Sequence, residues 1–164
     1  MRPMQTGNKV FKLGCAIALA VLGCAAWANG LPYDEAADAK AEVRQALADA
    51  GKDRRPVLLI FGANWCKDCR ALDQSLKGGK SAALMAHQFR VVKIDVGNFD
   101  RNLDIDEAYG HPIKKGIPAA VLLSADNRVL YATHAGELAD ARRMSDDGIY
   151  AFFKQTVDNA GTPK

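Results

Sequence analysis

The sequence predicts an α/β domain in which a central mixed β-sheet has helices on both faces. Two observations lead to this fold class. Segments with helical spacing alternate with short apolar runs along most of the chain. In addition, residues 57–61 (Val-Leu-Leu-Ile-Phe) are apolar at every position, which is typical of a strand buried on both faces. The 164 residues, 49% hydrophobic and 25% charged, fit one globular core.

The first 28 residues form a separate unit. Three basic residues precede an uncharged stretch over 13–28, which is shorter than the roughly 20 residues that a transmembrane helix needs. The stretch ends in Ala-Trp-Ala, which has small residues where a signal peptidase reads them. We therefore expect a secretory signal over 1–28, cleaved before Asn29, and a single exported domain over 29–164.

A second interpretation of the N-terminal segment stays open. Residues 21–24 (Val-Leu-Gly-Cys) resemble a lipoprotein signal, which would leave the periplasmic protein anchored through Cys24. Cleavage before Asn29 instead leaves Cys66 and Cys69 as the only thiols. It also lowers the formal net charge from +3 to zero, so that nucleic acid is not an expected partner.

The elements of the domain follow from the pattern of apolar residues. A helix is expected over 34–50, where apolar residues recur at three- and four-residue steps before Gly51. After the strand over 57–61, Cys69, Leu72 and Leu76 share one helical face, so residues 65–69 (Trp-Cys-Lys-Asp-Cys) open a helix. The remaining expected elements are a short helix over 81–87, a strand over 89–96, a helix over 103–109, strands over 119–123 and 129–133, and a last helix around 149–157 capped by Ser145.

The cysteine pair indicates disulfide exchange. The reaction proceeds by attack of a thiolate on a sulfur atom, so the attacking cysteine needs a lowered pKa. The N-terminus of a helix favours a negative sulfur at Cys66, and Cys69 lies one turn further along the same face. Of the two residues between them, Lys67 is expected to stabilise the thiolate and Asp68 to oppose it. No net effect of this dipeptide is therefore predicted.

The chain resembles the thioredoxin superfamily, in particular small periplasmic thioredoxin-like proteins, over most of residues 57–157. The resemblance rests on the apolar strand that leads into Trp-Cys-x-x-Cys and on residues 116–118 (Gly-Ile-Pro), which open a later strand. It implies a thioredoxin fold.

The same resemblance also implies roles for individual residues. Cys66 would be the exposed nucleophile and Cys69 the resolving thiol. Trp65 would serve packing and docking. Pro118 would be a cis residue facing the pair, and the backbone of Ile117 would bind an extended substrate segment.

One position departs from the family pattern. Thioredoxins proper carry a buried carboxylate six residues before the first cysteine, and this chain has Ile60 there. The usual proton acceptor for Cys69 is therefore missing. Lys93 lies where the family often has a lysine paired with that carboxylate. Here we expect Lys93 to pair with Asp95 or Asp68, or to extend to solvent.

These features predict an exported, periplasmic protein-disulfide oxidoreductase that acts as a monomer. The resemblance implies that it is a reductase or thiol relay and not a primary oxidant. Its expected partners are client proteins with thiols or disulfides and an upstream protein that donates or accepts electrons. No cofactor beyond the Cys66–Cys69 pair and no metal are expected. The alternative is a binding module of the same fold, either a carrier of copper or another soft metal that uses the two thiolates, or a docking protein whose cysteines are incidental.

Overall fold

The computed structural model describes residues 30–161, and the expectations for the signal segment and Cys24 lie outside them. The predicted mixed sheet is confirmed. It has the strand order β2-β1-β3-β4, with β1 parallel to β2 and antiparallel to β3, and β3 antiparallel to β4. The strands are β1 (Val57–Gly62), β2 (Arg90–Asp95), β3 (Ala119–Leu123) and β4 (Val129–Ala132).

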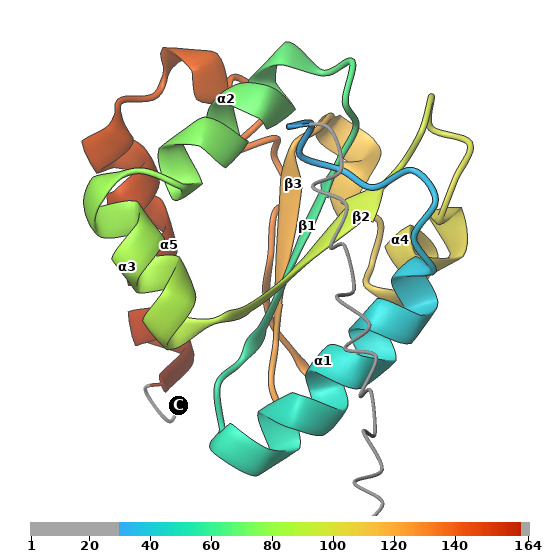
Figure 1. Cartoon of the computed structure of the whole chain (residues 1–164), viewed down its shortest axis with the longest axis vertical. Helices are drawn as coiled ribbons and strands as arrows, with labels where there is room; N and C mark the ends of the chain where they lie inside the picture. Colours follow the sequence, from blue (N-terminus) through green and yellow to red (C-terminus); the bar gives the residue numbers. More distant parts are fainter. Residues whose placement is uncertain (1–29, 162–164) are drawn as a thin grey trace, which may run out of the picture.

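Helices cover both faces of the sheet, as the sequence predicts (Figure 1). One face packs against α1 and α4, and the other packs against α2, α3 and α5. Two short 3-10 helices, η1 and η2, lie in the connections. The bounds are α1 (Ala39–Asp53), α2 (Lys67–Leu76), α3 (Gly79–Gln88), α4 (Leu103–Ala108), η1 (Pro112–Lys115), η2 (Ala141–Arg143) and α5 (Asp146–Gly161).

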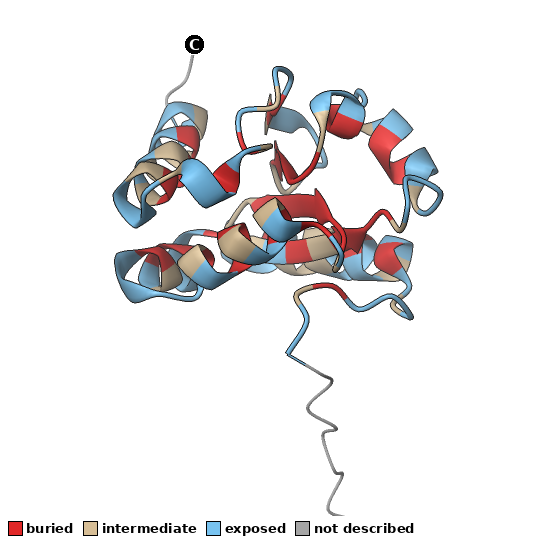
Figure 2. Cartoon of the chain, turned by 90° about the horizontal axis from the view of Figure 1, so that it is seen from above, coloured by how far each residue is buried: buried red, intermediate tan, exposed pale blue. Residues whose placement is uncertain are grey.

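The central strand β1 is buried along its whole length, which explains its unbroken apolar sequence. Leu59 and Phe61 belong to the core beneath α1, whereas Leu58 and Ile60 belong to the core beneath α2, α3 and α5. The buried residues accordingly lie in the sheet and on the inner sides of the helices (Figure 2). The cysteine motif follows directly after the carboxyl end of β1.

The first helix differs from the prediction at both ends. It begins at Ala39, because the Asp38 side chain accepts a hydrogen bond from the backbone N–H of Ala41 at 2.9 Å and caps it. It continues past Gly51 and ends at Asp53, followed by the C-cap residue Arg54 in the left-handed conformation. Residues 34–38 therefore precede α1 and are not helical. The chain before α1 is therefore able to reach the loop that follows β1.

The last helix begins as the sequence predicts. The Ser145 hydroxyl accepts a hydrogen bond from the backbone N–H of Gly148 at 3.0 Å, at the start of α5.

None of the helices in residues 30–161 has the length and hydropathy of a membrane-spanning segment.

Candidate active site at the N-terminus of α2

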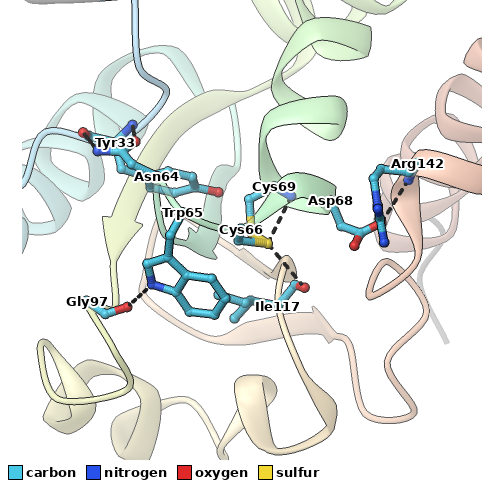
Figure 3. The surroundings of a disulfide bond; sticks show 9 residues. All are labelled: Tyr33, Asn64, Trp65, Cys66, Asp68, Cys69, Gly97, Ile117 and Arg142. Carbon is cyan, nitrogen blue, oxygen red and sulfur yellow. Dashed lines mark hydrogen bonds and ion pairs between the residues drawn. A yellow bond between two sulfur atoms is a disulfide. The ribbon is translucent and has the colours of Figure 1, made fainter.

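Cys66 and Cys69 form a disulfide at the start of α2, with their Cα atoms 5.2 Å apart (Figure 3). Cys66 is the N-cap residue, and its sulfur accepts a hydrogen bond from the backbone N–H of Cys69 at 3.1 Å. A free N–H group at the positive end of a helix stabilises negative charge on that sulfur. The geometry therefore favours Cys66 as the sulfur that carries charge in the reduced protein.

The expectation that Cys66 is exposed is wrong for the residue as a whole. Cys66 is 5% exposed and Cys69 is 1% exposed, because both belong to the core cluster on the α1 side of the sheet. The two cysteines still differ in access. Cys66 borders a shallow groove of about 420 Å³, whereas Cys69 does not line it.

The loop before β3 forms one wall of the groove. Its Ile117–Pro118 peptide bond is cis, and the Ile117 carbonyl oxygen lies 3.7 Å from Cys66 Sγ. Gly116 opens this loop in a backbone conformation that L side chains rarely adopt, with φ of +113°. The structure thus brings the two separate motifs of the sequence together at one sulfur.

Two aromatic side chains also line the groove. Trp65 is 53% exposed, and its indole N–H donates a hydrogen bond to the Gly97 carbonyl at 2.8 Å. Phe99 packs edge-to-face on the indole with ring centroids 6.1 Å apart, and it is 44% exposed. No sequence pattern marks Phe99, which lies in a polar loop after β2. The only local hint is an aromatic residue within that loop.

The opposite charges of Lys67 and Asp68 do not simply cancel beside the disulfide, because Asp68 has a partner of its own. Asp68 accepts hydrogen bonds from the backbone N–H and the Nε–H of Arg142, both at 3.0 Å. Burial opposes ionisation of Asp68, but these two hydrogen bonds and the positive charges of Arg142 and Arg143 together hold its pKa below the ordinary range. Arg142 therefore offsets the negative charge of Asp68, while Lys67 stays exposed at the groove.

The predicted partners of Lys93 are wrong. Lys93 forms an ion pair with Asp73 of α2, not with Asp95 or Asp68. The reason is the packing of α2 on this face of the sheet, which places Asp73 above the strand pair in which Lys93 lies opposite Ile60. The Asp73 side chain is only 9% exposed and also binds Lys77 at 2.7 Å. A buried carboxylate is therefore present, and it comes from the helix and not from the strand.

A tyrosine from the segment before α1 completes the site. Tyr33 is 4% exposed and points toward the cysteine pair (Figure 3). Its backbone N–H donates to the Asn64 side-chain oxygen at 3.0 Å, and the Asn64 amide donates to the Tyr33 carbonyl at 2.9 Å. Asn64 directly precedes Trp65, so it ties this segment to the motif. The contact joins residues far apart in the chain, and no local pattern predicts it.

A family model described as thioredoxin-like matches residues 38–125, which is more than half of the chain. The chain belongs to the thioredoxin-like family. Among solved structures, the protein is similar to a disulphide isomerase from Xylella fastidiosa Temecula1, with 59% identity and a TM-score of 0.76. That match covers 78% of this chain and 98% of the other.

More distant structures share the thioredoxin-like fold. A DsbH oxidoreductase is 18% identical with a TM-score of 0.54, over 70% of this chain and 81% of its own. The reduced C-terminal domain of DsbD from Neisseria meningitidis is 20% identical with a TM-score of 0.50, over 71% of this chain and 96% of its own. No curated protein matches the sequence.

The site has the features expected of a thiol-disulfide oxidoreductase. A disulfide lies at a helix N-terminus, and one of its sulfurs borders a groove with aromatic and charged walls. Within residues 30–161, no group of three or more His, Cys, Asp and Glu side chains is arranged to hold a metal ion. The disulfide at the helix N-terminus and the groove beside Cys66 favour disulfide exchange as the chemistry of this site.

Proposed function

We propose that the protein is an exported protein-disulfide reductase or thiol relay that cycles Cys66 and Cys69 between dithiol and disulfide. The observation that carries this proposal is the Cys66–Cys69 bond at the start of α2, with the Cys69 N–H directed at Cys66 Sγ. The disulphide isomerase that is 59% identical supports the same class of chemistry.

In the reducing direction, the Cys66 thiolate attacks one sulfur of a client disulfide. A bond forms between Cys66 and that sulfur, and the other client sulfur leaves with the electron pair and takes a proton from solvent. The Cys69 thiolate then attacks Cys66 Sγ, forms the Cys66–Cys69 disulfide and releases the second client thiol. An upstream thiol protein returns the pair to the dithiol state.

The groove beside Cys66 is the proposed client site. Trp65 and Phe99 offer an exposed aromatic surface, and the Ile117 backbone lies against Cys66 Sγ, the sulfur that attacks the client. Lys67 contributes positive charge to the same groove, where Arg142 and Asp68 form an ion pair. A client segment with apolar side chains near its disulfide fits these walls.

Variants of the two cysteines test the proposal. The wild-type protein should reduce insulin disulfides when a small dithiol supplies electrons, and Cys66→Ser should abolish the reaction. Cys69→Ser should accumulate mixed disulfides with clients, since the attacking thiolate is kept and the releasing thiol is lost. Non-reducing gels followed by mass spectrometry would identify the trapped proteins and, through them, the compartment.

The same variants separate the alternative function. If Cys69→Ser traps nothing while Cys66→Ser does, the two roles are reversed. If neither variant traps a client and the reduced wild-type protein binds one equivalent of Cu(I) that both variants lose, the protein is a metal carrier. Wild-type protein that neither reduces insulin nor exchanges with small disulfides would refute the redox function.

A further inference from the structure

Tyr33 and the resolving cysteine border the same small volume above Gly62. A Cβ atom built on Gly62 would lie 2.9 Å from Cys69 Sγ and would overlap the hydroxyl and the adjoining ring carbon of Tyr33. The glycine at the end of β1 thus leaves the space in which the phenol approaches the sulfur. Figure 3 shows the ring extending from the Asn64 contact toward the disulfide.

The position of the phenol is fixed by the motif itself. Asn64 holds the Tyr33 backbone through both its N–H and its carbonyl group, and it also donates to the Glu35 carboxylate at 2.9 Å. Three hydrogen bonds from one side chain hold the segment before α1 against the loop that carries Trp65 and Cys66. These bonds fix the backbone of Tyr33, and burial of its ring beside Gly62 holds the hydroxyl in place.

The surroundings keep this hydroxyl protonated. Burial, and after it the negative charges of Asp73 and Asp95, raise the pKa of Tyr33 well above its ordinary value. The Lys93 ammonium lies 5.8 Å from the centre of the ring and forms its ion pair with Asp73. A neutral phenol next to a sulfur is able to donate a hydrogen bond to it.

We propose that the Tyr33 hydroxyl donates a hydrogen bond to the Cys69 thiolate in the reduced protein and so supports the resolving step. In thioredoxins proper, a buried carboxylate at the position of Ile60 serves the resolving cysteine. Because Ile60 is apolar, the Tyr33 hydroxyl would be the polar partner of Cys69 in this protein. The inference rests on the proposed redox function and adds to it a residue outside the cysteine motif.

The proposed step balances in the following way. Cys69 loses its proton to solvent, and the resulting thiolate accepts the hydrogen bond from Tyr33, which stays protonated throughout. The thiolate attacks Cys66 Sγ of the mixed disulfide, the bond between Cys66 and the client sulfur breaks, and the client thiolate leaves and is protonated by solvent. Because Cys69 is enclosed by apolar groups, a donor at its sulfur favours the charged form.

Stopped-flow reaction of the fully reduced protein with an aromatic disulfide reagent separates the two steps. The first coloured thiolate is released when Cys66 attacks the reagent, and the second is released when Cys69 resolves the mixed disulfide. In Tyr33→Phe we expect the second release to slow about tenfold, as for loss of one hydrogen bond to a charged group, with the first release unchanged. Asn64→Ala, which frees the Tyr33 backbone, should slow the second release in the same direction.

The matched control is Tyr109→Phe. Tyr109 packs against the same core cluster, but its hydroxyl donates to Asn127 at 2.9 Å, so both releases should stay at wild-type rates. A second release within twofold of wild type in Tyr33→Phe, or equal slowing of both releases, would overturn the inference. Failure of the wild-type protein to release the second thiolate would instead refute the proposed function. If Tyr33→Phe does not fold, an unchanged second release in Asn64→Ala would equally overturn the inference.

Discussion

Asp73 of α2 and Lys93 of β2 form an ion pair that joins the redox helix to the edge strand of the sheet. The pair lies above Ile60, which is the register partner of Lys93 on β1. Asp73 is located one helical turn after Cys69, on the buried side of α2. A buried acid and a lysine therefore lie together near the resolving cysteine. The acid is on helix α2, whereas thioredoxins proper carry it on the strand, at the position of Ile60.

The two lysines that bind Asp73 should contribute unequally to stability. The Lys93 side chain is 26% exposed, whereas the Lys77 side chain is 65% exposed. We expect Lys93→Ala to lower the free energy of unfolding by about 1–3 kcal/mol, and Lys77→Ala by less than about 1 kcal/mol, since exposed ion pairs are weak. Urea denaturation of the reduced proteins measures both. Equal losses would show that burial does not set the strength of this pair.

Gly62→Ala should destabilise the protein by about 1–3 kcal/mol, because a new methyl group enters a filled space. The methyl group would displace the Tyr33 ring and crowd Cys69 Sγ. Gly51→Ala is the matched control, since nothing lies within 4 Å of its Cβ and the residue is in α1. There alanine should be neutral or stabilise by up to about 1 kcal/mol. A Gly62→Ala protein that unfolds at the wild-type urea concentration would contradict the proposed crowding.

Local periodicity was sufficient to predict the sheet and its helices. The apolar run of β1 and the helical face that contains Cys69, Leu72 and Leu76 each depend on residues close together in the chain. Such patterns report burial directly. The order of strand, motif and helix could therefore be predicted. That the Gly-Ile-Pro segment meets the disulfide is implied only by the resemblance to the thioredoxin superfamily.

The charged and polar neighbours of the cysteines could not be predicted in this way. Arg142 reaches Asp68 from 74 residues away, and Tyr33 reaches Asn64 from 31 residues away. The sequence predicts that Lys93 pairs with Asp95 or Asp68 or extends to solvent, because it does not show which face of α2 lies over β2. These contacts depend on the packing of separate elements, and no periodic pattern encodes them.

The pair formed by Asp68 and Arg142 should make stability depend on pH in the acid range. The pKa of Asp68 is lower in the folded protein than its ordinary value of 3.8, so the pair stabilises the fold above that pH. This contribution is lost as the pH falls through the lowered pKa. The difference in unfolding free energy between wild type and Arg142→Ala should therefore be constant from about pH 7 to about pH 5 and shrink as the pH falls below about 4.

Arg143→Ala provides the control for that measurement, because Arg143 affects Asp68 only through its charge and is the next residue in the chain. Its difference from wild type should be smaller at neutral pH. If the Arg142→Ala difference is the same at both ends of the pH range, the ionised form of Asp68 does not account for the contact between η2 and α2.

Phe99→Ala should weaken client binding and leave the intrinsic reactivity of Cys66 unchanged. Phe99 lines the groove and packs on Trp65, and its phenyl ring has no polar group that could change the charge on the sulfur atoms. We expect the KM for insulin to rise about fivefold with an unchanged rate of alkylation at Cys66, as for loss of one exposed aromatic contact. Val129→Ala removes a similarly exposed apolar side chain on β4 and should change neither value. A fall in alkylation rate in Phe99→Ala would place this residue in the reaction itself.

The residues around Cys66 are tied to three remote parts of the chain. Asn64 binds Tyr33, Trp65 binds Gly97, and Asp68 binds Arg142, across 31, 32 and 74 residues. Each of these contacts requires closure of a long loop, whose entropic cost must be met before the contact stabilises anything. A peptide of residues 64–76 would keep both cysteines but none of these restraints. The reactivity of the pair is therefore a property of the completed fold, and a chain still folding carries two ordinary thiols.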